Sequence, residues 1–378
     1  MSDPEMLRKQ IKLIIKHLNE AGNERGKMVS VLRKLDEQPL QQLPNYLRES
    51  FKDEFLFQIV EPEVLNGISV AGVDGGLVTT SLVSLDLIMI RAISVIFHYS
   101  ANGIKQIDYV PSKHPGVEFF PSDSIHGYSE FETFSGYQRV IKELEVANQV
   151  LKSYREHVDI LYMDGALNLG KFRPGLEKYQ ARIKLLTGEL LENARKRGST
   201  VAWCVKDSRT SYFLEFFGEL VPKVARHIPE ILNLDYRSIL KSSRDQHFMG
   251  IFLPVNSRSF LLKRTTGVDE IMEEIEKEMY SFYLKPTAYD VPFRIDFAMP
   301  RGVPDNYISN TAEKIASVTL PLSRIHEGYS VPVPIIEADA RARINQKEFQ
   351  ALVSSIRKRI FALDTLALKR ERSPFSFI

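Results

Sequence analysis

Residues 70–76 read VAGVDGG, and residues 160–166 read ILYMDGA. Each segment is a short, mainly apolar run that ends in an Asp-Gly pair, Asp74-Gly75 and Asp164-Gly165. Such runs are typical of strands buried on both faces of a sheet, and the glycine allows a sharp turn at the strand end. If the two strands are parallel neighbours, both carboxylates lie at the same edge of the sheet.

Two carboxylates at one edge of a sheet repel each other, and a bound divalent cation usually offsets that cost. An all-oxygen site favours Mg²⁺ or Mn²⁺. The alternative is that each Asp-Gly pair is only a turn, which is the commoner role of a single pair. Both interpretations remain open for Asp74 and Asp164 at this point.

A third carboxylate could come from the helix that the sequence predicts over residues 135–156. Residues 139–146 read RVIKELEV, so Glu143 and Glu145 flank the apolar stripe on opposite sides. Either side chain could reach over the edge of the sheet, although a solvated helix face is the usual environment of Glu. Three carboxylates could hold two metal ions about 4 Å apart, which is the arrangement that splits phosphodiesters.

The pattern around these segments predicts an α/β fold, in which an antiparallel meander and parallel strands form a mixed sheet flanked by helices. The first strand is expected to end at Gly75-Gly76. The N-terminal residues 6–35 have helical spacing, and the C-terminal half is less regular. Further strands are expected at 77–87, 88–99, 104–110, 200–205, 249–253, 259–262, 293–298 and 331–336, and further helices at 179–197, 214–228, 268–283, 310–325 and 346–366.

The order Asp strand, meander, Glu helix, Asp strand is the layout of RNase H-like nucleases. From about Gly72 to Ile344 the chain resembles the NurA family, the archaeal and bacterial RNase H-like nucleases that work with the HerA translocase. The segments that carry the resemblance are VAGVDGG, RVIKELEVA, ILYMDGAL, VAWCVKDSR and GYSVPVPIIEADARARI. The resemblance implies an N-terminal helical region at 1–60 that contacts a dimer partner or another protein. It also implies a nuclease domain at 61–378 with an insertion around 211–290.

The resemblance also implies roles for particular residues. Asp74, Asp164 and Glu145 match the family's metal ligands, with Glu143 as the alternate to Glu145. Lys206 matches a lysine placed against phosphate, and Tyr329 matches a tyrosine that positions substrate. Glu337 stands where the family has a histidine, so a carboxylate would complete the metal shell there, with Asp339 as a second candidate.

The resemblance implies that the chain is a DNA nuclease that uses two ions of Mn²⁺ or Mg²⁺. It would act as an exonuclease with possible endonuclease activity. The expected partners are DNA, a HerA-like hexameric ATPase that feeds DNA into the nuclease during end resection and repair, and a second copy of the chain. The basic residues Arg341 and Arg343 could hold DNA phosphates, or they could lie on a solvated helix face. The alternatives are a catalytically impaired subunit of the same assembly and, with less support, an actin-like phosphotransferase.

Composition limits the other classes of protein. The 378 residues carry 50 Lys and Arg against 48 Asp and Glu, so no overall charge indicates a nucleic-acid or membrane surface. The longest apolar run, residues 82–97, is interrupted by Asp86 and Arg91, which argues against a membrane span. The single cysteine, Cys204, excludes an internal disulfide and indicates a cytoplasmic protein.

Overall fold

The computed structural model describes residues 4–35, 40, 42–81, 86–122, 128–167, 175–264, 272–273 and 275–357. The chain divides into two compact units, each built from two stretches of sequence. The first unit comprises residues 1–64 and 203–332, and the second comprises residues 65–202 and 333–378. This division differs from the expected 1–60 and 61–378, because the N-terminal segment shares an apolar core with residues 213–283.

The second unit contains the two Asp-Gly segments. Its sheet has the order β6-β2-β3-β4, in which β2 and β6 are parallel and the β2, β3 and β4 meander is antiparallel. The mixed sheet expected from the sequence is therefore confirmed. The strands are β2 (Ser69–Ser81), β3 (Asp86–Ser100), β4 (Gly103–Val110), β5 (Glu118–Ser122), which pairs with β3, β6 (Ile160–Asp164) and β7 (Thr200–Val205), which contains the boundary between the units.

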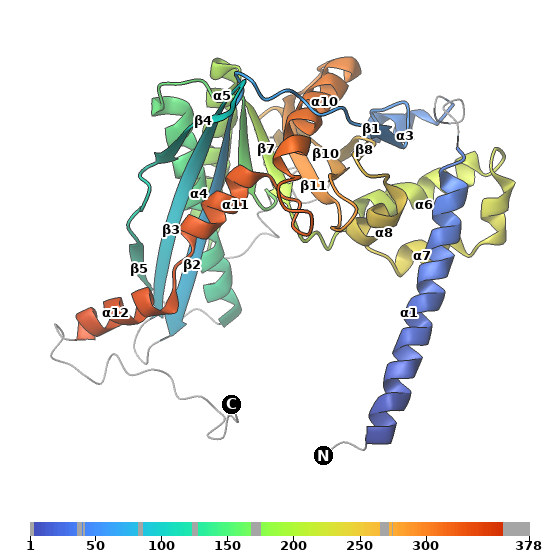
Figure 1. Cartoon of the computed structure of the whole chain (residues 1–378), viewed down its shortest axis with the longest axis horizontal. Coiled ribbons are helices and arrows are strands. Elements are labelled where there is room, and N and C mark those ends of the chain that lie inside the picture. The colour runs from blue at the N-terminus through green and yellow to red at the C-terminus, as the bar shows by residue number, and fades with distance from the viewer. Residues whose placement is uncertain are drawn as a thin grey trace. The chain divides into compact units, whose positions relative to one another are not determined.

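Helices cover both faces of this sheet (Figure 1). A Cβ added to Gly72 or Gly76 would collide with the backbone of α11 (Val333–Ala342), whereas one added to Gly75 would meet side chains of α4 (Tyr128–Ser153). Because successive strand residues face opposite sides, α4 and α11 lie on opposite faces of β2. Beside α4 lies α5 (Glu177–Arg197), which ends at Gly198 in the left-handed conformation, and α12 (Gln346–Arg357) follows α11.

The first Asp-Gly segment lies inside a strand and not at its end. β2 continues beyond Gly75 and Gly76 to Ser81, so the expected end of this strand was wrong. The two glycines are in the strand because helices approach it closely there, and a side chain would block them. The second Asp-Gly segment does lie at a strand end, because β6 ends at Asp164 and the next residue, Gly165, has a φ of 82°.

The first unit holds the remaining elements around an aromatic-rich core. Its sheet has the order β1-β8-β10-β11, with β9 paired to β10. Its elements are α1 (Pro4–Leu32), α3 (Asn45–Ser50), β1 (Phe57–Ile59), α6 (Tyr212–Val224), the 3₁₀ helix η1 (Pro229–Asn233), α7 (Tyr236–Lys241), α8 (Asp245–Phe252), β8 (Ser257–Ser259), β9 (Leu262–Arg264), β10 (Lys277–Lys285), β11 (Phe293–Pro300) and α10 (Asp305–Leu322).

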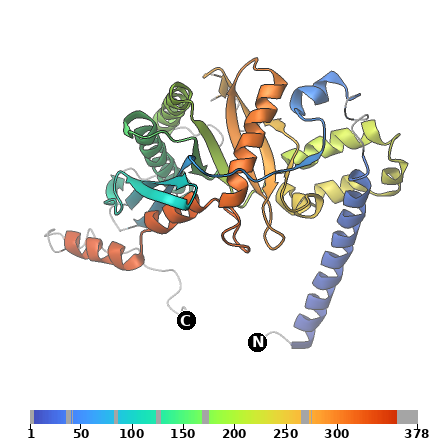
Figure 2. The same ribbon diagram turned by 45° about the horizontal axis from the view of Figure 1, so that its top comes forward.

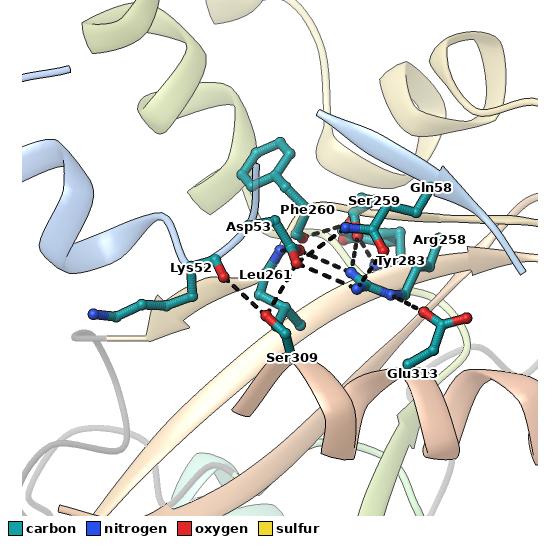
Figure 3. A network of polar contacts seen from close by, with 10 residues as sticks. All are labelled: Lys52, Asp53, Gln58, Arg258, Ser259, Phe260, Leu261, Tyr283, Ser309 and Glu313. Carbon is teal, nitrogen blue, oxygen red and sulfur yellow. Dashed lines mark hydrogen bonds and ion pairs between the residues drawn. The ribbon is translucent and has the colours of Figure 1, made fainter. Parts of the chain in front are cut away.

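A buried ion pair joins the two sequence stretches of the first unit (Figure 3). The guanidinium of Arg258 donates to both carboxylate oxygens of Asp53, at 2.8 and 3.2 Å, and both side chains are 1% exposed. Gln58, Glu313 and the backbone oxygen of Ser259 accept further hydrogen bonds from it at 2.9, 3.0 and 3.1 Å. Because a buried charge must be fully paired, this network fixes residues 53–58 against β8 and α10.

The expected strand at 259–262 is divided between the end of β8 and the start of β9, and the expected helix at 346–366 is α12 up to Arg357, with the rest outside the described residues. Three other expected elements of the irregular half were wrong. In the expected strand at 249–253, residues 249–252 belong to helix α8, and residues 331–336 lie mainly in helix α11. The expected helix at 268–283 ends in strand β10, because residues 279–284 are buried on both faces, and its beginning lies partly outside the described residues. Within the described part of the chain, no helix is both long enough and apolar enough to span a bilayer.

Candidate active site

The second unit brings Asp74 and Asp164 together at the end of β6. The parallel register pairs Val73 with Met163, so the next residue of each strand, Asp74 and Asp164, lies beside the other. Asp74 is 3% exposed, and its Oδ1 accepts a hydrogen bond of 2.7 Å from the backbone N–H of Gly75. The carboxylates meet because one strand passes through the point at which its neighbour stops.

Glu143 is the third carboxylate at this place. It comes from α4, is 4% exposed and interacts electrostatically with both Asp74 and Asp164. Burial away from water is the main cause that raises the pKa of Glu143 to about 8; Arg139 opposes this rise, and the charges of Asp74 and Asp164 add to it. A buried carboxyl group with a raised pKa beside two other acidic side chains is typical of a functional site.

Gly75 makes the approach of Glu143 possible. A Cβ at Gly75 would lie 2.6 Å from Oε1 and 2.9 Å from Cγ of Glu143. It would also lie 3.1 Å from Cγ of Arg139, one helical turn earlier on α4. The carboxylate of Glu143 and the stem of Arg139 therefore occupy the space that a side chain at residue 75 would fill.

The structure brings Glu143, rather than Glu145, to the two aspartates. Glu145 is on the side of α4 that faces α5, where its Oε1 lies 3.2 Å from Nη2 of Arg182. Its side chain is 39% exposed, and Lys142 lies 3.9 Å from its other oxygen. Two residues along a helix rotate a side chain by about 200°, so only one of the two glutamates can face β2.

The chemistry of the three carboxylates fits a divalent cation, since oxygen ligands and a dense negative charge suit Mg²⁺ or Mn²⁺. Their present positions do not form a closed ligand set. Among the residues that the structure describes, no group of three or more His, Cys, Asp or Glu side chains is placed to hold an ion. Glu143 instead pairs with Arg139, whose Nη1 lies 3.1 Å from its Oε1.

Comparison with known proteins settles the family. The model of the NurA domain matches residues 68–344, close to the stretch in which the sequence resembles that family. This chain belongs to the NurA nuclease family. The family and the class of enzyme expected from the sequence are therefore confirmed.

A solved NurA structure has the same fold. The crystal structure of the NurA nuclease from Sulfolobus solfataricus matches with a TM-score of 0.55 and 15% identity, over 95% of this chain and 99% of that one. A NurA structure with manganese matches with a TM-score of 0.47 and 12% identity, over 95% of this chain and 100% of that one. At such identities the similarity concerns the fold alone. No curated protein sequence matches this NurA chain at a significant level.

Glu337, which stands in place of the histidine expected from the family resemblance, lies on α11. Its Oε1 accepts a hydrogen bond of 2.7 Å from Nε of Arg341, one turn later on the same helix. Ala338, the next residue, is fully buried, and α11 passes over Gly72 near Pro334 and over Gly76 at Ala342. Glu337 and Asp339 therefore flank the residue of α11 that lies along the Asp74 segment of β2.

The two predicted DNA-binding arginines differ in their surroundings. Arg341 pairs with Glu337, and its guanidinium lies 4.5 Å from the ring centroid of Tyr109. The side chain of Arg343 is 74% exposed, and its Nη2 lies 3.5 Å from Oδ2 of Asp339. Arg343 has the more accessible charge, whereas Arg341 is held in place from two sides.

Tyr329 and Lys206 belong to the first unit. Tyr329 is 46% exposed, and the Nζ of Lys206 lies 5.9 Å from the centroid of its ring. The two residues expected to contact substrate therefore lie together. Within the second unit, sequence analysis did not identify Arg139. The sequence does contain a signal for this residue. Arg139 and Glu143 are spaced i and i+4 on one helix, which places their side chains on the same face.

Proposed function

We propose that this NurA protein is a metal-dependent DNA nuclease whose metal ligands are Asp74, Glu143 and Asp164. The observation that carries the proposal is the convergence of three carboxylates from β2, α4 and β6, with Glu143 buried between the helix and the strand. Such a cluster of like charges is unfavourable in the metal-free protein and becomes favourable when cations bind to it.

The bound ions would be Mn²⁺ or Mg²⁺, two in number. When bound, such ions activate a water and stabilise the leaving oxygen of a phosphodiester. The chain's own residues have separate tasks in this proposal. Asp74 and Asp164 hold their carboxylates on the rigid sheet, Gly75 leaves room for Glu143, and Glu337 contributes a further oxygen from α11.

Other residues of this proposal bind the DNA. Lys206 and Tyr329 lie together in the first unit, so a phosphate near Lys206 and a sugar or base near Tyr329 could be held side by side. Arg343 offers an exposed guanidinium for a backbone phosphate, and Arg341 would position Glu337.

The proposed biological role is DNA end resection, in which an exonuclease with possible endonuclease activity acts with a HerA-like hexameric ATPase in the cytoplasm. The family resemblance supports this role. The proposal also includes a homodimer, which the exposed apolar side chains of α1 support. Leu7, Ile11, Ile14 and Leu18 are 50%, 46%, 58% and 58% exposed.

A second candidate is a catalytically impaired subunit that serves as a structural partner of the ATPase. It is favoured by the carboxylate at residue 337, which pairs with Arg341 and cannot replace a neutral imidazole as a base. An actin-like phosphotransferase is the third and weakest candidate.

The test is degradation of end-labelled single- and double-stranded DNA with Mn²⁺, with Mg²⁺ and without metal. The wild type should cleave only with metal, and Asp74→Asn and Asp164→Asn should each lower the rate at least about a hundredfold, since each removes a ligand charge. No cleavage by the wild type under any condition, together with intact DNA binding, would favour the impaired subunit. Binding of ATP by the chain alone would favour the phosphotransferase.

A further inference from the structure

Arg139 is the cation that the structure pairs with the carboxylate cluster. It lies one turn before Glu143 on α4, and its Nη1 is 3.1 Å from Oε1 of Glu143. The Arg139 side chain is 35% exposed, whereas that of Glu143 is 5% exposed. One end of this ion pair is therefore fixed in the interior, and the other has room to move.

The pair is built into the contact between α4 and β2. Cγ of Arg139 and Oε1 of Glu143 both lie over Gly75, at 3.1 and 2.6 Å from the position of a Cβ there. The aliphatic stem of Arg139 therefore lies over the strand residue that follows Asp74. Its guanidinium lies beside Glu143, the carboxylate that interacts with both aspartates.

A metal ion and Arg139 would compete for the same oxygen. Glu143 can serve as a metal ligand only if its carboxylate turns toward Asp74 and Asp164, and Arg139 holds one of its oxygens. Once that oxygen is taken by a cation, the positive charge of Arg139 loses its partner. A guanidinium in this position is well suited to a phosphate, since its planar fork donates two parallel hydrogen bonds.

We propose that Arg139 has two alternative partners: Glu143 while no metal ion is bound, and a phosphate oxygen of the DNA backbone once that carboxylate has turned to the ion. This inference rests on the proposed nuclease function and adds a substrate-binding residue to it. Arg139 keeps the metal-free cluster partly neutralised and then binds the substrate only when the metal site is filled.

The test uses the full-length protein and the variants Arg139→Gln, Arg139→Lys and Arg182→Gln. Arg182 is the matched control, because it makes a comparable ion pair with Glu145 on the other side of α4. Two quantities are measured at pH 8: the affinity for Mn²⁺ by calorimetry, without DNA, and kcat and KM on single-stranded DNA at saturating Mn²⁺.

Arg139→Gln should bind Mn²⁺ about two- to fivefold more tightly, because a competing charge is gone, and its kcat/KM should fall at least about tenfold. Arg139→Lys keeps the charge but loses the fork, so its Mn²⁺ affinity should stay within about twofold of wild type while kcat/KM falls. Arg182→Gln should match the wild type in both Mn²⁺ affinity and kcat/KM. The lysine variant gives a result even if the glutamine variant does not fold.

The inference is overturned if Arg139→Gln binds Mn²⁺ as the wild type does or more weakly, since Arg139 would then not compete with the ion. It is also overturned if kcat/KM is unchanged at saturating metal, since Arg139 would then not bind phosphate. The wild-type measurements judge the proposed function separately. A wild type that binds Mn²⁺ but leaves DNA intact contradicts the proposed nuclease function. The calorimetric comparison of the variants still shows whether Arg139 competes with the metal ion for Glu143.

Discussion

Gly75 is the residue on which the geometry of the site depends most. We predict that Gly75→Ala destabilises the fold by about 1–3 kcal/mol, because its methyl group would lie 2.6 Å from Oε1 of Glu143. The displaced carboxylate should also lower the affinity for Mn²⁺. Urea denaturation and calorimetry measure the two effects.

Gly136→Ala is the matched control for this substitution. Gly136 lies on α4, and a Cβ there has no atom within 4 Å. Alanine should stabilise the helix by about 0.5–1 kcal/mol and leave the Mn²⁺ affinity unchanged. Equal stability of the Gly75→Ala variant and the wild type would mean that Glu143 does not occupy this space.

Glu143 should make the metal-free protein less stable as the pH rises. Burial raises its pKa from 4.5 to about 8, so the folded protein keeps a proton that the unfolded chain releases over this interval. The free energy of unfolding therefore falls as pH increases through the interval, by up to about 1.4 kcal/mol per pH unit. Glu143→Gln removes this contribution, because the amide does not titrate.

Urea denaturation in EDTA at several pH values measures the effect. The difference in unfolding free energy between Glu143→Gln and wild type should grow in favour of the variant from about pH 5 to pH 8. The same substitution at Glu145, which is 39% exposed, should not produce this growth. A constant difference across the interval would contradict the burial of Glu143 beside two aspartates.

Sequence alone could predict part of the site at the scale of residues. The two Asp-Gly pairs follow apolar runs, and this pattern made Asp74 and Asp164 candidates, although a plain turn remained the alternative until the family resemblance was considered. The choice between Glu143 and Glu145 was open, because both flank the apolar stripe of α4. Only the contact with Gly75 decides which side of the helix faces the strand.

At the scale of elements, α11 shows how tertiary structure overrides local pattern. Residues 331–336 look like a strand because they alternate Val, Pro and Ile, yet residues 333–342 form a helix. Ile335, Ala338 and Ala342 recur at helical spacing and are buried against β2, where Gly72 and Gly76 admit a helix backbone. The glycines that receive the helix are about 260 residues earlier in the chain, so no local window contains the signal.

Ala338 is expected to be intolerant of larger side chains. We predict that Ala338→Leu costs about 1–3 kcal/mol of stability, because the residue is fully buried between α11 and the sheet. Ala340→Leu on the exposed side of the same helix should change stability by less than about 0.5 kcal/mol. Thermal denaturation measures the stability of both variants. Similar losses of stability in the two would mean that α11 does not pack on β2 through Ala338.

At the scale of the whole molecule, the apolar stripe of α1 is buried at one end of the helix and exposed at the other. Its apolar positions recur at spacings of four and three residues, a pattern typical of helices that pair. Toward the C-terminal end Met28 and Leu32 are buried, in the part of α1 that packs against helices of its own unit. Toward the N-terminal end the helix extends away from them (Figure 2), and Leu7, Ile11 and Ile14 stay exposed.

A second copy of the chain should cover this stripe. The double substitution Ile11→Asp and Ile14→Asp should convert a dimer into a monomer, because charges would then face each other across the apolar seam. Light scattering after gel filtration measures the mass. Lys16→Asp, which lies away from the stripe, should leave the dimer intact. A wild type that is monomeric at all concentrations would contradict the proposed homodimer.

The architecture was predictable where the chain is regular and less so where distant segments combine. The Glu helix, β4 and β6 were expected near their observed positions, because each has a clear pattern of hydrophobicity. The expected strand at 77–87 was wrong: residues 77–81 continue β2, residues 86–87 begin β3, and residues 82–85 lie outside the described residues. The division into two units could not be predicted from the sequence. Residues before 65 join the aromatic core of residues 213–283, and Asp53 forms the buried ion pair with Arg258. No sequence period records such a pairing between distant stretches.

The most direct test of the central claim compares Glu143→Gln with Glu145→Gln in Mn²⁺-dependent degradation of end-labelled DNA. Glu143 lies with Asp74 and Asp164, whereas Glu145 pairs with Arg182 on the other side of the same helix. Glu143→Gln should lose at least about a hundredfold in rate, and Glu145→Gln should stay within about threefold of wild type. Loss of activity in Glu145→Gln, with Glu143→Gln still active, would contradict this account of the site.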